Sequence, residues 1–134
     1  MDIRIEKIKT DLSPEEVYSH FRHITDTALL NSSMDTDAGR YSFLGIEPFL
    51  VFKSRKNKVQ ITVNRKIYLE ITDPLKRLKS LLEEYKTENP TNLPFVSGGI
   101  GYFSYDLKNM LEKLPHKAKD DLNVPDIYFV FYRS

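Results

Sequence analysis

Short runs of alternating hydrophobic and polar residues recur along this 134-residue chain and predict β-strands. The clearest pair, 59–63 and 67–71, flanks Asn64-Arg65-Lys66 and predicts a hairpin, although the turn lacks the favoured Asn-Gly. The continuous apolar and aromatic run 127–132 is typical of a central strand with a neighbour on each side. Further strand-like segments are 2–8, 26–33, 41–46, 49–54 and 95–105.

Two segments repeat their hydrophobic residues at helical spacing. One begins at Ser13-Pro14, a favourable N-cap and first position, and its apolar face comprises Val17, Phe21 and Ile24. The other begins at Asp73-Pro74, and its stripe comprises Leu75, Leu78, Leu82 and Tyr85. A short helix is also expected over 107–114. This order of elements predicts an α+β fold with a mainly antiparallel sheet that is backed by helices on one face.

The length corresponds to one domain, 1–134, and no internal repeat or boundary divides it. Few segments remain to flank the strand 127–132 on its far side. We therefore expect this run to expose an apolar face, the isolated chain to self-associate, and the sheet to be completed by protein outside this chain.

Composition limits the class of protein. The hydrophobic fraction of 40% supports a packed core, and a net charge of +1 gives no general attraction to nucleic acid or membranes. The absence of cysteine excludes disulfides and thiolate metal sites. The charged segment 1–7 does not fit a signal peptide, and no apolar run approaches the ~20 residues that cross a bilayer. We therefore expect a soluble, cytoplasmic protein with neither nucleic acid nor membrane as partner.

Three chemically suggestive clusters have simpler interpretations. His20 and His23 share a helix face, but a zinc site needs further ligands and His116 is the only other histidine. The segment 35–39 begins like a calcium loop but places its glycine at the fifth position instead of the sixth. A basic cluster fits a charged strand edge that resists aggregation, and it comprises Lys53, Arg55, Lys56 and Lys58. No metal site or cofactor is expected in this chain.

The segment 98–106 is the most unusual part of the sequence. Its run Gly98-Gly99-Ile100-Gly101 indicates that another backbone or a ligand approaches closely, and it fits neither a P-loop nor a dinucleotide fingerprint. Because strand residues alternate between faces, Gly99 and Gly101 share one face with Phe103 and Tyr105. We expect the strand that carries Ser32 to approach this face, and we expect Gly98 to tolerate a side chain better.

A set of segments in order resembles component I of the chorismate-utilising amidotransferase synthases, a family that includes anthranilate synthase and aminodeoxychorismate (para-aminobenzoate) synthase. The resemblance covers nearly the whole chain and corresponds to the N-terminal part of these proteins. The segments that carry it are Leu29-Leu30-Asn31-Ser32, Gly39-Arg40-Tyr41-Ser42-Phe43-Leu44-Gly45 with Glu47-Pro48, 94–106, Leu111-Glu112-Lys113-Leu114-Pro115, Asp120-Asp121-Leu122 and Pro125-Asp126.

In this family the chorismate and magnesium site lies in the C-terminal region, which nothing in this chain matches. The resemblance therefore implies a non-catalytic portion of an enzyme that is inactive alone and forms part of a larger β-sandwich. It implies Mg²⁺ in the full-length enzyme. It also implies two protein partners, the enzyme's own C-terminal catalytic region and a glutamine amidotransferase subunit.

The resemblance further implies a pocket of the kind that binds tryptophan in this family. Ser32 would offer a hydroxyl to the polar end of the ligand, Arg40 a cation for its carboxylate, and Tyr41 an aromatic wall. Residues expected at the pocket wall or at the seam between domains are Gly99, Gly101, Phe103, Tyr105 and Asp106.

Two features favour the aminodeoxychorismate branch, which leads to folate. One is the ending 112–126, and the other is Asn31, where anthranilate synthases commonly carry Glu before the serine. Anthranilate synthase component I, in tryptophan biosynthesis, remains the alternative within the family. A free-standing small-ligand-binding or interaction domain is the alternative outside it.

Overall fold

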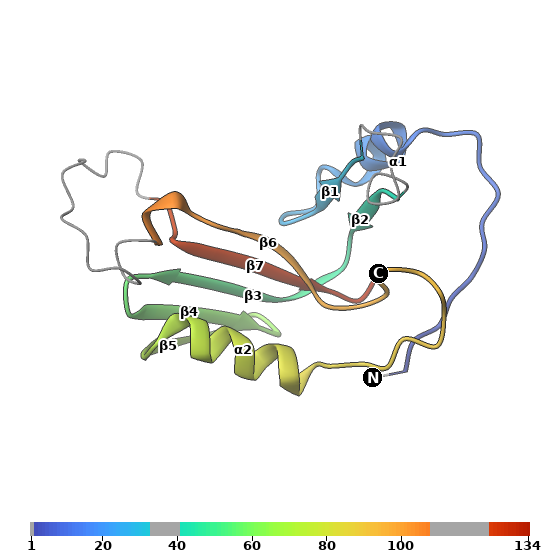
Figure 1. Cartoon of the computed structure of the whole chain (residues 1–134). Helices are drawn as coiled ribbons and strands as arrows, with labels where there is room; N and C mark the ends of the chain where they lie inside the picture. The colour runs from blue at the N-terminus through green and yellow to red at the C-terminus, as the bar shows by residue number, and fades with distance from the viewer. Residues whose placement is uncertain (1, 33–40, 108–123) are drawn as a thin grey trace.

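The computed structural model describes residues 2–32, 41–107 and 124–134, except for the Asp106 side chain. Figure 1 shows a five-stranded sheet with one helix, and a smaller unit at one end of it. The elements are α1 (Pro14–Phe21), β1 (Ala28–Leu30), β2 (Phe43–Gly45), β3 (Pro48–Arg55), β4 (Lys58–Val63), β5 (Lys66–Ile71), α2 (Pro74–Glu84), β6 (Gly99–Phe103), the 3-10 helix η1 (Tyr105–Leu107) and β7 (Ile127–Tyr132). The predicted α+β class is confirmed.

The larger sheet has the strand order β5-β4-β3-β7-β6, and each neighbouring pair is antiparallel. Strands β3, β4 and β5 form a meander. At the turn between β4 and β5, Asn64 and Arg65 have φ values of 50° and 64°, the left-handed conformation that joins tight hairpins. The predicted hairpin is therefore confirmed, with Asn and Arg in the conformation that usually favours glycine.

Strand β7 lies inside the sheet, between β3 and β6. The side chain of Ile127 is fully buried, and that of Phe131 is 1% exposed. The prediction of a central strand is confirmed. The expectation that this run exposes an apolar face is wrong, because Ile127, Val130 and Phe131 are buried and the other three side chains of β7 are half-buried.

Helix α2 covers one face of the sheet. Its N-terminus is capped by Asp73, whose Oδ1 accepts hydrogen bonds from the N–H groups of Leu75 (3.0 Å) and Lys76 (3.3 Å). Full burial of a large apolar side chain contributes about 1.5–3 kcal/mol, so the cluster under this helix is the main source of stability. This cluster comprises Leu50, Phe52, Val59, Ile61, Leu78, Leu81, Leu107, Ile127 and Phe131.

The smaller unit consists of α1 and the antiparallel pair β1–β2. The hydroxyl of Ser13 caps α1 by accepting a hydrogen bond from the N–H of Glu16 (3.2 Å). Two tyrosines of β7 link this unit to the larger sheet. The Tyr128 hydroxyl donates to the Asp26 carboxylate, and the Tyr132 hydroxyl donates to the Asp26 carbonyl. Because α1 belongs to this unit, α2 is the helix that backs the larger sheet among the described residues.

Several predicted boundaries differ from the structure. Segment 2–8 is not a strand, and its Ile5 and Ile8 are 48% and 79% exposed, because alternation alone does not supply a partner strand. The segments 26–33 and 95–105 shorten to β1 and β6. Beyond Leu107, the helix predicted over 107–114 lies outside the described residues. Within the described ranges, no helix combines the length and apolar character that a membrane span requires.

Candidate functional site

A network of hydroxyl and amide groups joins the ends of β1 and β2. The Ser32 hydroxyl donates to the Tyr41 carbonyl, and the Ser32 N–H donates to the Ser42 hydroxyl (3.3 Å). The Ser42 hydroxyl in turn donates to the Asn31 side-chain oxygen (2.7 Å), while the Asn31 amide donates to the Glu15 carboxylate of α1. Ser32 and Tyr41, two of the predicted site residues, therefore lie in contact. The third, Arg40, lies outside the described residues.

Aromatic rings extend from this network toward the larger sheet. The rings of Tyr41 and Phe43 stack with their centroids 6.3 Å apart, and Phe43 meets Phe95 edge-on at 5.4 Å. Phe43 and Phe95 also line a hollow of about 240 Å³ between β2, the segment 95–98 and the residues at the end of β7. Stacked and edge-on rings of this kind offer a surface on which a planar, apolar ligand can pack.

The glycine-rich segment lies near this hollow, but not as the sequence predicted. Gly98, with a φ of 130°, and Ile100 line the hollow, whereas Gly99 and Gly101 do not. A Cβ on Gly101 would lie 1.9 Å from the carbonyl oxygen of Tyr128, so the backbone that approaches Gly101 is β7. The expectation that the Ser32 strand approaches this face is wrong.

The remaining predicted site residues lie beyond the hollow. Phe103, the last residue of β6, is 52% exposed, and Tyr105, the first residue of η1, is 80% exposed. Phe103 packs on Phe129 with ring centroids 5.1 Å apart. The Asp106 side chain lies outside the described residues. Phe43 and Phe95 were not predicted as site residues. Phe43 lies in the block 39–45 and Phe95 in the block 94–106, both of which carry the family resemblance. Their place in these blocks is the signal that could have identified them as site residues.

The hollow also contains a tyrosine with a perturbed acidity. Burial, together with the nearby charge of Asp26, raises the pKa of Tyr132 to about 12. Its ring lies against β2, since a Cβ on Gly45 would be 2.5 Å from the ring. The single proton of the Tyr132 hydroxyl is used in the hydrogen bond to the Asp26 carbonyl, so the residue contributes its ring to the hollow.

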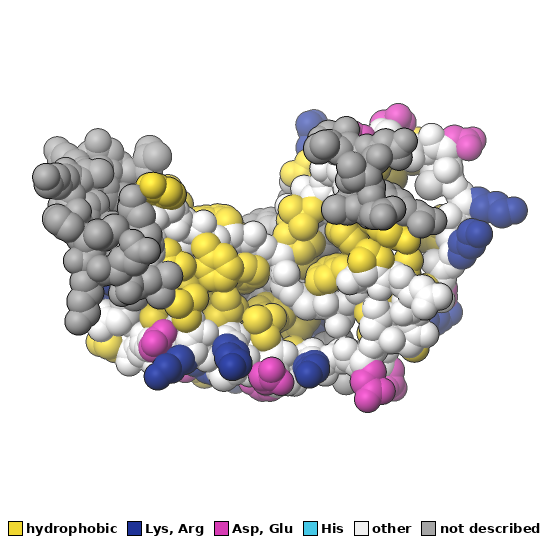
Figure 2. All heavy atoms as spheres, viewed as in Figure 1, with side chains coloured by type: hydrophobic (Ala, Val, Ile, Leu, Met, Phe, Trp, Pro, Cys, Tyr) yellow, Lys and Arg dark blue, Asp and Glu magenta, His cyan; other side chains and the backbone are white. Residues whose placement is uncertain are grey.

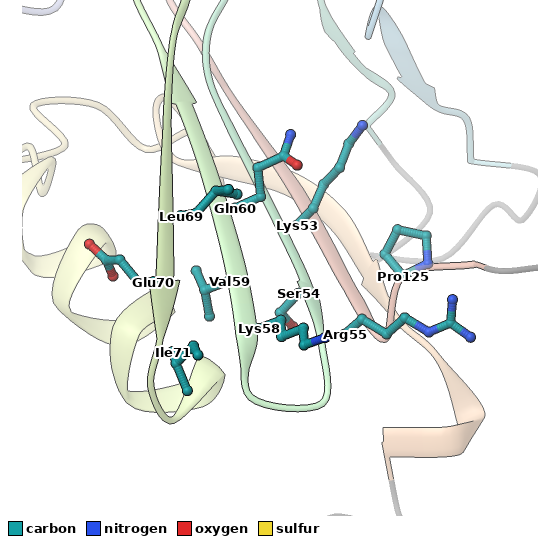
Figure 3. A pocket seen from close by; sticks show the side chains of 10 residues that line it. All are labelled: Lys53, Ser54, Arg55, Lys58, Val59, Gln60, Leu69, Glu70, Ile71 and Pro125. Carbon is teal, nitrogen blue, oxygen red and sulfur yellow. The ribbon is translucent and has the colours of Figure 1, made fainter.

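A larger hollow of about 590 Å³ lies at the β3–β4 turn, over the strands that extend to β5. Figure 3 shows three basic side chains along it, Lys53, Arg55 and Lys58, beside Leu69 and Ile71. None of the predicted site residues lines it. In the parts of the chain that the structure describes, no group of three or more His, Asp or Glu residues could hold a metal ion.

Comparison with known proteins identifies the family. No family model matches the chain. Anthranilate synthase component 1 of Acetivibrio thermocellus is 34% identical over 122 residues, which is 89% of this chain. Aminodeoxychorismate synthase component 1 of Bacillus subtilis (strain 168) is 33% identical over 95 residues, which is 70% of this chain. The chain belongs to this component 1 family.

The match covers only part of each relative. The chain spans about a quarter of the length of the Acetivibrio protein (25%) and a fifth of the Bacillus protein (20%). The anthranilate synthase component 1 of Lactococcus lactis gives the same result, with 98% of this chain aligned to 28% of its length at 28% identity. The Acetivibrio and Bacillus relatives differ by one percentage point in identity, over 122 and 95 aligned residues, so percentage identity does not choose between anthranilate synthase and aminodeoxychorismate synthase.

Proposed function

We propose that this chain is the non-catalytic N-terminal portion of an aminodeoxychorismate synthase component 1. The whole enzyme would aminate chorismate toward para-aminobenzoate and folate, in the cytoplasm. The observation that carries this proposal is the extent of the matches, which cover most of this chain but a quarter or less of the two relatives from Acetivibrio and Bacillus. Catalysis and Mg²⁺ binding would then belong to the remainder of the enzyme, and this chain alone would be inactive.

Two protein partners follow from the proposal. The catalytic C-terminal region would pack against this domain and complete a larger β-sandwich, and a glutamine amidotransferase subunit would supply ammonia. Exposed apolar side chains support such packing, because Phe103 and Leu82 are 52% and 42% exposed. Figure 2 shows hydrophobic side chains gathered in the hollowed middle of the molecule, above a row of charged side chains.

The choice of branch rests on the ending 112–126, most of which lies outside the described residues, and on Asn31. The side-chain oxygen of Asn31 accepts a hydrogen bond from Ser42, just before β2, and its amide nitrogen donates one to the carboxylate of Glu15 on α1. A glutamate at this position would bring a second carboxylate toward Glu15, and two like charges in contact destabilise each other. The hydrogen bonds with Ser42 and Glu15 therefore suit an amide side chain at position 31, which supports the aminodeoxychorismate branch over anthranilate synthase.

The hollow beside the aromatic rings would hold a tryptophan-type ligand. Phe43 and Phe95 line the hollow and would enclose the indole ring, with Tyr41 as a further aromatic wall, while Ser32 and Arg40 would meet the polar end of the ligand. Because the Ser32 hydroxyl already donates to the Tyr41 carbonyl, its role would be to position Tyr41 as well as to meet the ligand.

Two chimaeric enzymes test the branch. In one, this chain replaces the matching segment of the Bacillus aminodeoxychorismate synthase component 1, and in the other, that of the Acetivibrio anthranilate synthase component 1. We expect aminodeoxychorismate from the first, with chorismate, Mg²⁺ and an ammonium salt, and no product from the second or from this chain alone. Activity of the second chimaera alone would favour anthranilate synthase, and turnover by the isolated chain would refute the non-catalytic role.

Direct binding tests the pocket. Because the chain contains eight tyrosines but no tryptophan, the fluorescence of added L-tryptophan reports binding without protein background when it is excited at a wavelength that tyrosine does not absorb. Phe95→Ala should weaken binding at least tenfold, since Phe95 lines the hollow. Leu93→Ala is the matched control, because Leu93 is similarly exposed (39% against 37%) and does not line it. Equal affinities for the two variants would contradict the assignment of this pocket.

A further inference from the structure

Strand β5 forms one edge of the larger sheet and exposes an unusual number of apolar side chains. Ile67, Leu69 and Ile71 are 63%, 77% and 78% exposed, and they lie on the face of the sheet that is opposite α2. Edge strands of soluble proteins usually carry charges or prolines that prevent pairing with other chains. These three positions of β5 carry neither.

The backbone of the same three residues is directed away from the sheet. The N–H of Thr72 donates to the carbonyl of Asn57 (2.9 Å), which fixes the hydrogen-bonding phase of the β4–β5 ladder. In an antiparallel ladder, residues alternate between pairs that exchange hydrogen bonds and pairs that do not. Glu70 and Tyr68 therefore bond to β4, and the N–H and C=O groups of Ile67, Leu69 and Ile71 point outward.

We propose that β5 pairs with β5 of a second copy of this chain, antiparallel and about a two-fold axis through Leu69. In this register Leu69 lies opposite Leu69, and Ile67 lies opposite Ile71 on both sides of the axis. Each of these pairs brings together outward-directed N–H and C=O groups, so each exchanges two backbone hydrogen bonds. The same side chains form a continuous apolar stripe across the junction.

The charges on the other face of β5 agree with this register. Tyr68 lies opposite Glu70 of the second copy, and Lys66 is diagonal to that carboxylate, within reach of a long side chain. No like charges lie opposite each other. On the same face, Arg77 of α2 already binds the Glu70 carboxylate, with 2.7 Å between Nε and Oε2, so Lys66 of the second copy would be a further cation beside this carboxylate.

The distribution of charge favours association of two copies through their β5 edges over stacking of their exposed sheet faces. The face that carries Ile67, Leu69 and Ile71 also carries Lys53, Arg55 and Lys58 (Figure 3). Stacking two such faces would bring three basic side chains of each copy together. Pairing through the β5 edge keeps the basic side chains of the two copies apart.

Single-cysteine variants test the register directly, because the chain has no cysteine of its own. Residues opposite each other at a hydrogen-bonded pair have Cα atoms about 5.5 Å apart, within the range that a disulfide spans, whereas diagonal neighbours are about 7–8 Å apart. Leu69→Cys should therefore form a covalent dimer under mild oxidation at least tenfold faster than Tyr68→Cys, the adjacent exposed control. Equal rates, or faster coupling at Tyr68, would overturn the register.

Sedimentation equilibrium tests the association itself. A junction this short buries less than the roughly 1,200–2,000 Å² of a stable complex, so we expect a dimer that forms only at high concentration. Leu69→Glu places two carboxylates on the axis and should weaken association at least tenfold, while Leu82→Glu on α2 should not. A chain that stays monomeric at high concentration, or one whose association is unchanged by Leu69→Glu, would overturn the proposal.

Discussion

Replacing Gly101 with alanine tests how β6 is held against β7. A Cβ at this position would lie 1.9 Å from the carbonyl oxygen of Tyr128 and 2.7 Å from the Cα of Phe129. Both are backbone atoms of a central strand whose other edge is bound by β3. They cannot move away without breaking sheet hydrogen bonds, so the new methyl group must push the two strands apart.

The expected cost follows from this contact. Overpacking commonly costs about 1–3 kcal/mol, and a clash with backbone places Gly101→Ala at the upper end of that range. With a denaturant slope of about 2 kcal/mol/M in urea, a loss of about 3 kcal/mol lowers the unfolding midpoint by roughly 1.5 M. Urea unfolding followed by circular dichroism measures this shift.

Two neighbouring glycines provide controls. A Cβ on Gly99 would meet its nearest neighbours at 3.4–3.6 Å, an ordinary contact, so Gly99→Ala should be neutral or gain up to about 1 kcal/mol through the unfolded state. Gly98 has a φ of 130°, so Gly98→Ala should be destabilised by strain. The expectation that Gly98 tolerates a side chain better than Gly99 is therefore wrong. If Gly101→Ala unfolds at the same urea concentration as Gly99→Ala, the β6–β7 register is refuted.

Three further predictions concern the core, a helix cap and pH. Leu78→Ala should cost about 2–5 kcal/mol in thermal unfolding, and Leu82→Ala far less, because Leu82 is 42% exposed; equal losses would contradict the packing of α2. Asp73→Ala should cost about 1 kcal/mol, and Asp73→Asn should retain most of the cap. The pKa of Tyr132 is raised to about 12, so the folded state holds this proton where the unfolded chain releases it near 10. Stability should fall as pH rises from 10 to 12, and this fall should be smaller in Tyr132→Phe.

Local signals in the sequence predicted the elements whose geometry is set by nearby residues. The caps at Ser13 and Asp73 lie where the helices begin, and the hairpin of β4 and β5 forms between the predicted segments, although Lys66 pairs with Val63 in β5 instead of belonging to the turn. Such features depend on contacts between residues a few positions apart. The strand predicted over 2–8 had the right alternation, but a strand also needs a partner, and no pattern within a segment supplies one.

The site was predicted only in the part where its residues are close in sequence. Ser32 follows β1 and Tyr41 precedes β2, two paired strands of one short sheet, and the two residues meet as expected. The contact between Phe43 and Phe95 joins residues about fifty positions apart, and it depends on how β2 lies against the segment 95–98. The sequence pattern predicts that 127–132 is a central strand, but it does not determine which strands flank it or where the segment 95–98 lies.

The position of β7 has a consequence for the order of folding. The meander of β3, β4 and β5 and the helix α2 are formed by neighbouring segments, so they can assemble early at little cost in loop entropy. Strand β7 must then enter between β3 and β6 from more than seventy residues away, pairing Tyr132 with Pro48. Asp26 bonds to two tyrosines of β7, so α1, β1 and β2 can dock only after that step. The segment that is synthesised first among the described elements is therefore expected to reach its final place last.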